Sequence, residues 1–372
     1  MEFLKPIRIL QVVTIMNRGG LETMLMNYYR EIDRSKIQFD FMVHRTEEGH
    51  YDKEIKQLGG KIFRMPQIKP GNYRRYFKLL SEFFTNYKEY KVVHSHINEN
   101  SSFVLRAAKR AGVPCRIAHS HLSDLSIDFK LPFRLYARYS MKDYPNNYFA
   151  CSVKAGQWLF NKRSTSPKEV IVLNNAVNTK EFRYNENIRN DIRNELGIDK
   201  NQLVIGHIGR FNKQKNHEYL IDIFHAVYKQ RPDSILTLIG DGDLRQAIER
   251  KVESIGLSTN VKFLGVRSDI SNLMQAMDLF LFPSLFEGLP VVLVEAQAAG
   301  LNCIVSDTIT KESNITGNVE YISLGESPED WADKILSTSY EHKDTSTILN
   351  ERGYDTETMS KWLTNYYMDH TL

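Results

Sequence analysis

Short runs rich in valine and isoleucine alternate with helix-length segments along the whole chain, and this alternation limits the fold more than any other feature. Runs of this kind that are joined by helical crossovers are typical of a parallel sheet with helices on both faces. The sequence therefore predicts an α/β fold built on doubly wound parallel sheets. In the first half the runs lie at 8–14, 39–44, 61–65, 91–96, 115–120, 148–152 and 170–174.

The alternation stops in a polar stretch at 174–200 and then starts again. A chain of 372 residues exceeds what one hydrophobic core usually serves. We therefore expect two Rossmann-like domains, 1–176 and 177–350, which face a central cleft, and a last helix within 351–372 that packs back on the first. The runs of the second half lie at 203–209, 234–240, 260–265, 278–283 and 302–306.

Composition and charge exclude several classes of protein. The chain is 42% hydrophobic and 25% charged with a formal net charge of +4, which is typical of a globular protein and gives no reason to expect a nucleic-acid partner. No stretch is apolar for long enough to cross a bilayer, and the first 16 residues read as a buried strand rather than a signal peptide. Three scattered cysteines fit neither a disulfide framework nor a zinc site. We expect a cytoplasmic protein without a metal.

Two cations follow a strand in the second half. The segment GRFNKQKN places Arg210 and Lys215 in a loop between a strand that ends at Gly209 and the next helix. Backbone N–H groups at a helix start favour anions, and two cations beside them can hold a diphosphate without a metal. The alternative is a solvated basic loop.

Two acidic residues lie in an otherwise apolar stretch, FPSLFEGLPVVLVEAQAAG. Glu287 falls in a loop after a strand, and Glu295 falls in the helix that starts near Pro290, a residue favoured in the first turn of a helix. Buried carboxylates need partners, and the hydroxyl groups of a ribose or a sugar would supply them. The alternative is that one glutamate caps a helix while the other pairs with a lysine.

The pair EGLPVVLVE resembles the motif of the family-4 retaining glycosyltransferases, which have the GT-B fold, and the likeness covers nearly the whole chain. NRGG at 17–20 resembles the family's glycine-rich loop, and GRFNKQKN resembles its arginine and lysine loop. LIGDGDL, VKFLG and LNNAVNTKEF are similar to three further segments. The interdomain segment departs from the usual Asn-Gly-Val-Asp, since this chain has Asn-Ala-Val-Asn at 175–178.

The resemblance implies a role for each matching residue. Glu295 would hold the nucleotide ribose and Glu287 the hydroxyls of the donor sugar, while Arg210 and Lys215 would hold the diphosphate. The remaining positions would line the donor site through their backbones, at the phosphates, the sugar and the base: Gly19, Gly20, Gly265, Val266, Gly288, Leu289 and Val291.

The tripeptide HSH occurs at 94–96 and again at 119–121, each time at the end of a predicted strand. Because side chains alternate along a strand, both histidines of a pair face the same way. A metal site is one interpretation, but no aspartate or cysteine completes a ligand set, and the two pairs need not share a layer. The resemblance implies instead that one histidine meets the donor sugar, with His121 the first choice and His119 the second.

Two segments of the first half, 72–91 and 128–144, combine cations with aromatic residues. In the second, Lys130, Arg134, Arg138 and Lys142 recur every four residues. Such helices lie on anionic membrane surfaces, and the alternative is a solvated face with long aliphatic stems. We expect contact with the inner face of the plasma membrane if the acceptor is carried on a lipid.

Together these features predict a metal-independent, retaining glycosyltransferase that needs no cofactor. Its donor would be a nucleotide sugar, with UDP the expected nucleotide, and its acceptor a hydroxyl of a cell-surface polysaccharide precursor or a lipid-linked saccharide. The turn GDGDLR follows the second strand of its half, so it does not match a dinucleotide fingerprint. A nucleotide-sugar epimerase and a non-catalytic partner subunit of the same fold remain as alternatives.

Overall fold

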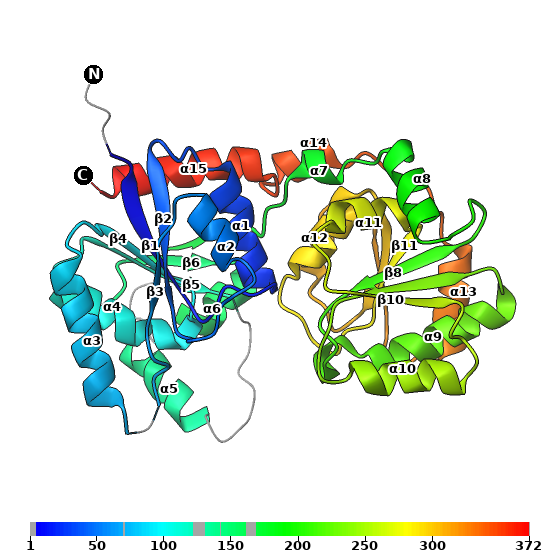
Figure 1. Cartoon of the computed structure of the whole chain (residues 1–372), viewed down its shortest axis with the longest axis horizontal. Helices are drawn as coiled ribbons and strands as arrows, with labels where there is room; N and C mark the ends of the chain where they lie inside the picture. Colours follow the sequence, from blue (N-terminus) through cyan, green and yellow to red (C-terminus); the bar gives the residue numbers. More distant parts are fainter. Residues whose placement is uncertain (1–4, 70, 122–130, 142, 161–168, 372) are drawn as a thin grey trace. The chain divides into compact units, whose positions relative to one another are not determined.

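The computed structural model describes residues 5–69, 71–121, 131–141, 143–160 and 169–371 (Figure 1). The chain divides into two compact units. The first unit comprises Met1–Ala176 and Thr356–Leu372, and the second comprises Val177–Asp355. Within the described residues, no helix combines the length and the apolar character that a bilayer crossing requires.

The first unit contains a seven-stranded parallel sheet in the order β3-β2-β1-β4-β5-β6-β7. Its strands are β1 (Ile7–Val13), β2 (Ile37–Val43), β3 (Ile62–Arg64), β4 (Val92–Ser95), β5 (Cys115–Ser120), β6 (Asn147–Ala150) and β7 (Val170–Val172). Its helices are α1 (Gly20–Glu31), α2 (Asp52–Gln57), α3 (Tyr73–Asn86), α4 (Ser101–Arg110), α5 (Leu131–Ser140), α6 (Val153–Phe160) and α15 (Thr356–Asp369), with a 3₁₀ turn at Asn98–Asn100.

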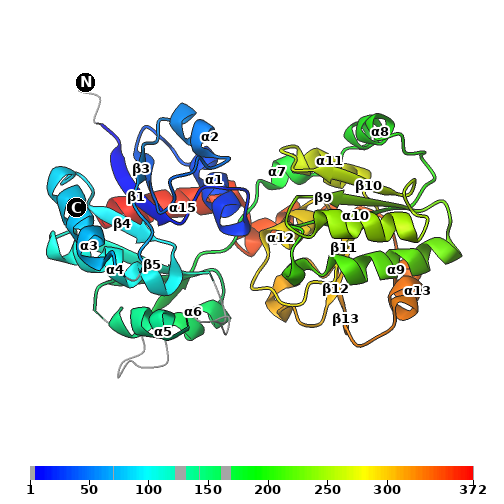
Figure 2. The same ribbon diagram turned by 60° about the horizontal axis from the view of Figure 1, so that its bottom comes forward.

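Helices cover both faces of this sheet (Figure 2). On one face α3, α4 and α5 pack on Leu10, Val12 and Val93 in a core of aromatic and aliphatic residues. On the other face lie α1 and α15, which pack against each other, and α15 also contacts β2. Alternating side chains of one strand therefore serve two different environments, apolar on the first face and partly polar on the second.

The C-terminal helix α15 buries a different side from the one that its large apolar residues predict. Met359, Trp362, Leu363 and Tyr366 have helical spacing, yet Trp362 is 38% exposed. The buried side instead carries small polar residues together with Leu363 and Tyr367. Its members are Thr356, Ser360, Leu363, Thr364 and Tyr367.

The second unit repeats the same order with six parallel strands, β10-β9-β8-β11-β12-β13. The strands are β8 (Val204–Ile208), β9 (Ile235–Ile239), β10 (Val261–Gly265), β11 (Leu279–Phe282), β12 (Asn302–Ser306) and β13 (Val319–Ile322). The helices are α7 (Thr179–Phe182), α8 (Glu186–Glu195), α9 (His217–Gln230), α10 (Arg245–Ser254), α11 (Ile270–Ala276), α12 (Val291–Ala298), α13 (Pro328–Ser337) and α14 (Ser346–Glu351), with 3₁₀ turns at Lys213–Lys215 and Lys311–Ser313.

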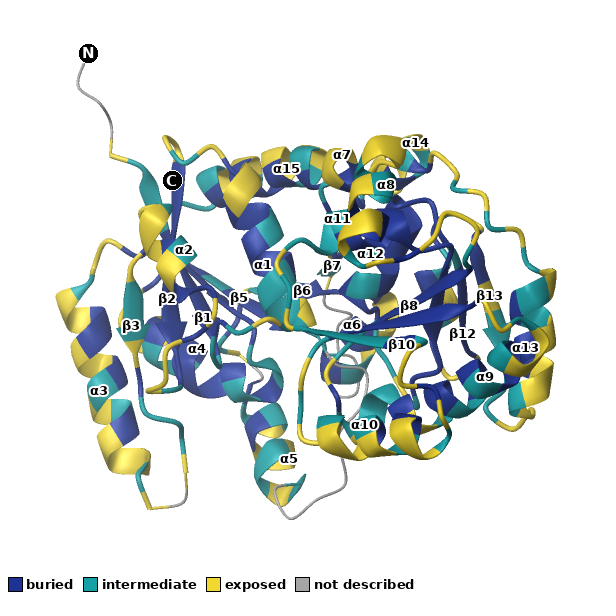
Figure 3. Cartoon of the chain, turned by 45° about the vertical axis from the view of Figure 1, so that its right-hand side comes forward, coloured by how far each residue is buried: buried dark blue, intermediate teal, exposed yellow. Residues whose placement is uncertain are grey.

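Burial in both units follows the strands, which are mostly dark blue in Figure 3. The two sheets confirm the predicted doubly wound α/β fold. The sequence analysis missed β13, an edge strand of four residues in which only Val319 is buried, because so short a run lacks the apolar pattern of an inner strand.

The polar stretch 174–200 is folded, although its apolar periodicity is weak. Its helix α8 is fixed by charge: Arg189 and Arg193, four residues apart, both form ion pairs with Asp278, which lies directly before β11. The Arg193 guanidinium donates to Asp278 Oδ2 at 2.7 Å and is buried. These salt bridges act beside a single buried apolar residue of α8, Ile192, which is too little for a search for periodicity to detect.

Candidate functional site

In each sheet the strand order reverses once, and parallel sheets bind ligands at the carboxyl ends of the strands beside that reversal. In the first unit the reversal lies between β1 and β4, and in the second unit between β8 and β11. Most of the side chains that the sequence analysis singled out follow these strands. We describe the two places separately, beginning with the second unit.

The loop that carries Arg210 and Lys215 is fixed by the turn after β9. The backbone N–H of Phe211 donates to the Asp241 carbonyl at 3.0 Å. Gly240 has a φ of +136°, and a Cβ at this position would lie 2.1 Å from the carbonyl oxygen of Gly209. The GDG turn therefore serves the close packing of two loops.

A second set of contacts ties the same loop to the one after β11. The Leu285 N–H donates to the Gln214 carbonyl at 2.8 Å, and the Asn216 side chain donates to the Pro283 carbonyl at 3.1 Å. Because β8 and β11 are neighbours, their two loops meet at one edge of the sheet. Lys215 and Glu287, 72 positions apart, are brought together there.

Lys215 and Glu287 form an ion pair. Lys215 Nζ donates to Glu287 Oε1 at 2.6 Å, and the two side chains are only 15% and 9% exposed. The ammonium also lies 4.4 Å from the ring centroid of Phe282. The alternative in which one glutamate pairs with a lysine therefore describes Glu287 in this structure, and each residue supplies the charge that the other needs for burial.

Two further charged residues of the second unit were predicted to belong to the donor site, Arg210 and Glu295. Arg210 is exposed, and among the described residues its guanidinium has no hydrogen-bond or ionic partner. Glu295 is half-buried and is the fifth residue of α12. Pro290 is the N-cap of α12. The Leu293 N–H donates to the Pro290 carbonyl at 3.1 Å, and the N–H groups of the two residues between them lie before the first complete turn, where an α-helix offers no acceptor.

The backbone positions predicted to line the site vary in environment. Leu289 and Val291 are buried, whereas Gly288 is half-buried. Gly265 ends β10 with a left-handed φ of +66°, and Val266 after it is 47% exposed. In the first unit, Gly19 is the N-cap of α1 with an extended φ of −131°, and Gly20 is the first residue of that helix.

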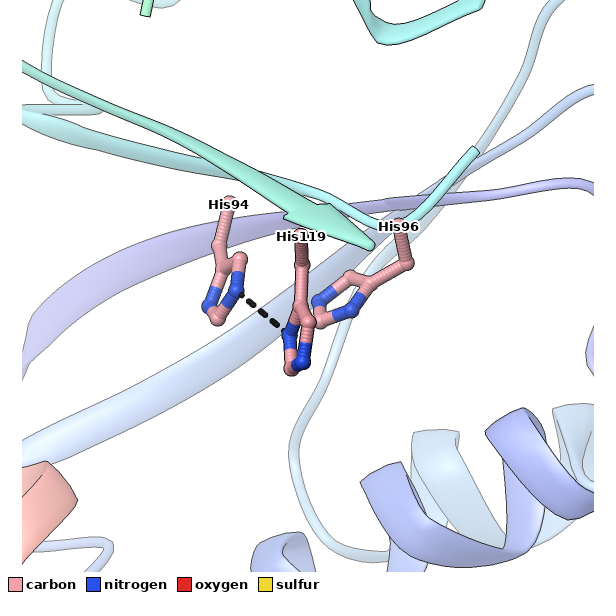
Figure 4. A group of neighbouring side chains, drawn as sticks. All are labelled: His94, His96 and His119. Carbon is pink, nitrogen blue, oxygen red and sulfur yellow. Dashed lines mark hydrogen bonds between the residues drawn. The ribbon is translucent and has the colours of Figure 1, made fainter. Parts of the chain in front are cut away.

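The first unit holds a cluster of imidazoles, here called the histidine cluster: His94, His96 and His119, which are buried, and His121, which is half-buried. The rings of His94 and His96 lie on one face, as strand alternation predicts, with centroids 4.1 Å apart. His119 lies beside them (Figure 4), and His94 Nε2 is 3.1 Å from His119 Nδ1. Similarly, His96 Nδ1 is 3.0 Å from His121 Nε2. The two HSH pairs therefore do share a layer.

Two residues that the sequence analysis did not assign to the site complete the histidine cluster. Gln11 on β1 lies 2.8 Å from His96 Nε2 through its Oε1 atom, and Tyr367 Oη on α15 lies 2.7 Å from His94 Nδ1. Gln11 Nε2 donates to Tyr367 Oη at 3.3 Å. A polar residue that interrupts an apolar first strand was the available sign for Gln11. No feature of the sequence pointed to Tyr367, because it lies 356 positions from Gln11 in the chain.

Burial keeps the histidine cluster neutral. It lowers the pKa of His94, His96 and His119 well below the usual value, and the neighbouring imidazoles lower these pKa values further. Burial also lowers the pKa of His121 to about 3. His94, His96 and His119 each offer one ring nitrogen within 4.8 Å of the others, so their donor set suits a transition metal such as zinc.

The segments 72–91 and 128–144, which combine cations with aromatic residues, place some of these side chains in the core and others in solvent. In α3 the aromatic residues Tyr76, Phe83 and Phe84 are buried, while Arg74, Arg75 and Lys78 are exposed. In α5 the Arg138 guanidinium donates to the Trp158 carbonyl and lies 5.0 Å from the Trp158 ring centroid. Arg138 is thus turned toward the protein. Positions 128–130 and 142, including Lys130 and Lys142, lie outside the described residues.

Comparison with known proteins agrees with this architecture. Residues 18–181 match the Glycosyltransferase Family 4 model, and residues 188–355 match Glycosyl transferases group 1. The chain is 35% identical to the putative glycosyltransferase EpsF of Bacillus subtilis, over 97% of this chain and 96% of that one. It is 29% identical to an Escherichia coli UDP-Gal:α-D-GlcNAc-diphosphoundecaprenol α-1,3-galactosyltransferase, over 65% of this chain and 61% of that one.

Among solved structures, HepE of Anabaena in complex with UDP matches with a TM-score of 0.79 and 20% identity, over 97% of this chain and all of that one. This likeness supports the fold and confirms the predicted GT-B class. The two family models cover both units, and the EpsF relative spans nearly the whole chain. The chain therefore belongs to the glycosyltransferase family described by the group 1 and family 4 models, and it is a glycosyltransferase.

Proposed function

We propose that the protein transfers a sugar, with retention of configuration, from a UDP-sugar to a hydroxyl of a lipid-linked saccharide that is a precursor of a cell-surface polysaccharide. The Escherichia coli relative carries a UDP-sugar donor and a lipid-linked acceptor in its name, and the Anabaena structure holds UDP. The observation that carries the proposal is the Lys215–Glu287 pair beside the N-terminus of α12, at the strand reversal of the second unit.

The chemistry of the donor follows from the charges in the second unit. Cleavage of the bond between the sugar and the diphosphate leaves negative charge on the phosphate, and groups aimed at that charge accelerate the reaction. Arg210 has a guanidinium free to hold the diphosphate, and the N–H groups at the start of α12 favour the same anion. Lys215 would turn from Glu287 toward the phosphate, so no metal is required.

The two carboxylates then contact hydroxyl groups. Glu287, released from Lys215, would accept hydrogen bonds from the donor sugar, and Glu295 would accept them from the ribose. The resemblance to the family assigns a further contact with the sugar to His119 or His121. We assign no covalent nucleophile, since retention in this family proceeds by departure and attack on one face of the sugar.

The exposed cations of α3 support contact with an anionic membrane surface. Arg74, Arg75 and Lys78 supply three of them, although α5 turns Arg138 away from solvent. Sedimentation with vesicles that contain anionic lipids should bring the protein down, and replacement of the three residues by glutamine should abolish this.

The donor is tested with a panel of nucleotide sugars by thermal shift, because a ligand that binds only the folded protein raises its apparent stability. We expect UDP-sugars to raise the melting temperature more than sugars on other nucleotides. Incubation with the best donor and a lipid-linked saccharide should then release UDP only when the acceptor is present. UDP or an isomerised nucleotide sugar without acceptor would identify an epimerase, and no product with any acceptor would favour a non-catalytic subunit.

A further inference from the structure

The histidine cluster is part of one continuous hydrogen-bond chain whose centre is Gln11. An amide group has fixed roles, because its nitrogen only donates and its oxygen only accepts. Gln11 Nε2 donates to Tyr367 Oη at 3.3 Å, and Gln11 Oε1 faces His96 Nε2 at 2.8 Å. These two contacts decide the position of every proton farther along the chain.

The first arm runs through Tyr367. Its Oη accepts from Gln11, so the hydroxyl proton goes to its other neighbour among the described residues, Nδ1 of His94, at 2.7 Å. His94 then carries its proton on Nε2 and donates to Nδ1 of His119 at 3.1 Å. His119 in turn carries its proton on Nε2, which is buried and has no partner among the described residues. The first arm ends in an unused donor.

The second arm runs the other way. His96 must donate from Nε2 to Gln11 Oε1, so its Nδ1 is an acceptor. His121 donates to that acceptor from its own Nε2 at 3.0 Å. All four imidazoles therefore carry their proton on Nε2, and His121 keeps an unprotonated Nδ1. The lowered pKa values of the cluster agree with neutral rings that each hold one proton.

We propose that Gln11 and Tyr367 are positioning residues that hold the four histidines in the Nε2–H form, which leaves His119 with a buried N–H donor and His121, the half-buried end of the second arm, with an unprotonated Nδ1. The proton order rests on the first unit alone, whereas its effect on sugar transfer rests on the proposed function. A buried donor without a partner is unfavourable.

A metal ion is the competing explanation for three neighbouring histidines, and the ring geometry favours hydrogen bonds. The ring centroids of His94 and His119 are 5.1 Å apart while Nε2 and Nδ1 are 3.1 Å apart, so the two rings meet edge to edge, as an N–H directed at a lone pair requires. Both ring nitrogens of His94 and of His96 are already engaged in hydrogen bonds. A metal would have to displace these hydrogen bonds.

The proton order is measured by ¹⁵N NMR on protein labelled only at histidine, with assignments from single replacements in the cluster. The expected result is a protonated Nε2 and an unprotonated Nδ1 at all four rings. Protonation on Nδ1 would mean that the Gln11 amide is reversed and would overturn the proposal. Shifts typical of metal coordination that disappear with a chelator would also overturn it.

Tyr367→Phe tests the role of the hydroxyl, with Tyr366→Phe as the matched control. Tyr366 is on the same helix, and its hydroxyl donates to Asn147 Oδ1 at 2.7 Å, outside the cluster. Tyr367→Phe should leave His94 and His119 as mixtures of both proton forms and lower kcat for sugar transfer about tenfold, with UDP affinity unchanged. Tyr366→Phe should change neither.

The outcomes separate the two proposals. Unaltered proton forms in Tyr367→Phe refute the positioning role, and so does an unaltered kcat. If the wild-type protein transfers no sugar from any donor, the proposed function fails, and the NMR result on the wild type still supports or refutes the proton order.

Discussion

The two units have the same strand order but place different chemistry at the reversal. In the first unit β1, β4, β5 and the residues directly after β4 and β5 carry neutral imidazoles with Gln11, and the contacts are hydrogen bonds between uncharged groups. In the second unit the loops after β8 and β11 bring together an ammonium and a carboxylate. One fold thus supports a network of neutral groups in one place and an ion pair in the other.

The difference lies in how each group is positioned. The histidines are fixed by strands and by a helix from the far end of the chain, so their orientation is set before any ligand binds. Lys215 ends a 3₁₀ turn and Glu287 lies in a loop, and the two side chains pair with each other, so under the proposed function a ligand would replace either partner. The first arrangement suits the orientation of one hydrogen bond, and the second suits the binding of a charged group.

The largest expected effect comes from acid. Burial lowers the pKa of His94, His96, His119 and His121 in the folded first unit, whereas the unfolded value is about 6.5. Unfolding therefore binds protons below pH 6.5. Stability that is fully present above pH 6.5 is lost as the pH falls toward the folded pKa values, by about 1.4 kcal/mol per histidine and pH unit.

Hydrogen exchange measured by mass spectrometry at pH 7 and pH 5 reports the protection of backbone amides in each unit separately. His44 in the first unit also has a pKa lowered by burial, as do three histidines of the second, His207, His217 and His342. We expect protection to be lost first in β4 and β5. Earlier loss in β8 and β11 would show that the neutral cluster is not the acid-sensitive part.

The next effect tests the ion pair. Lys215→Ala should weaken UDP binding about 10- to 100-fold, since a charge-assisted hydrogen bond contributes about 1.5–3 kcal/mol. It should also lower the free energy of unfolding of the second unit by about 1–3 kcal/mol, because Glu287 would remain largely buried without a cation. Calorimetry with UDP and urea unfolding measure the two quantities.

Lys213→Ala is the control for this variant, because Lys213 is an exposed cation of the same 3₁₀ turn. It should change neither quantity. Adding Glu287→Gln to Lys215→Ala should restore most of the stability without restoring UDP affinity. Unchanged UDP affinity in Lys215→Ala would contradict the role of Lys215 at the diphosphate.

The sequence predicted the fold well because the inner strands are nearly continuous apolar runs. It failed where order depends on other forces: α8 is held by Arg189 and Arg193 on Asp278, and the edge strand β13 is too short to stand out. The strand-end loops were predictable from strand limits. Which side chains meet within them was not, since Lys215 and Glu287 contact each other across 72 positions.

The histidine cluster shows the same limit more strongly. Alternation predicted that both histidines of each HSH face one way, and the ring centroids of the two pairs, 4.1 and 4.0 Å apart, agree with this. The adjacency of the two pairs depends on the pairing of β4 with β5, which a single sequence does not reveal. Tyr367 depends on how α15 packs, and its large apolar residues indicated a different buried side.

The smallest expected effect comes from Glu287→Gln alone, which makes the second unit resemble the neutral first one. Without its carboxylate partner Lys215 is free for a diphosphate, so UDP affinity should stay equal or rise up to about fivefold, the equivalent of about 1 kcal/mol. Sugar transfer should fall, because the glutamine amide accepts fewer hydroxyl hydrogen bonds than a carboxylate. Glu218→Gln, which changes an exposed glutamate of α9, should alter neither. An equal loss of UDP affinity and of sugar transfer in Glu287→Gln would instead assign Glu287 to nucleotide binding. The ion pair would then be part of the diphosphate site, and Glu287 would not leave Lys215 to bind the sugar.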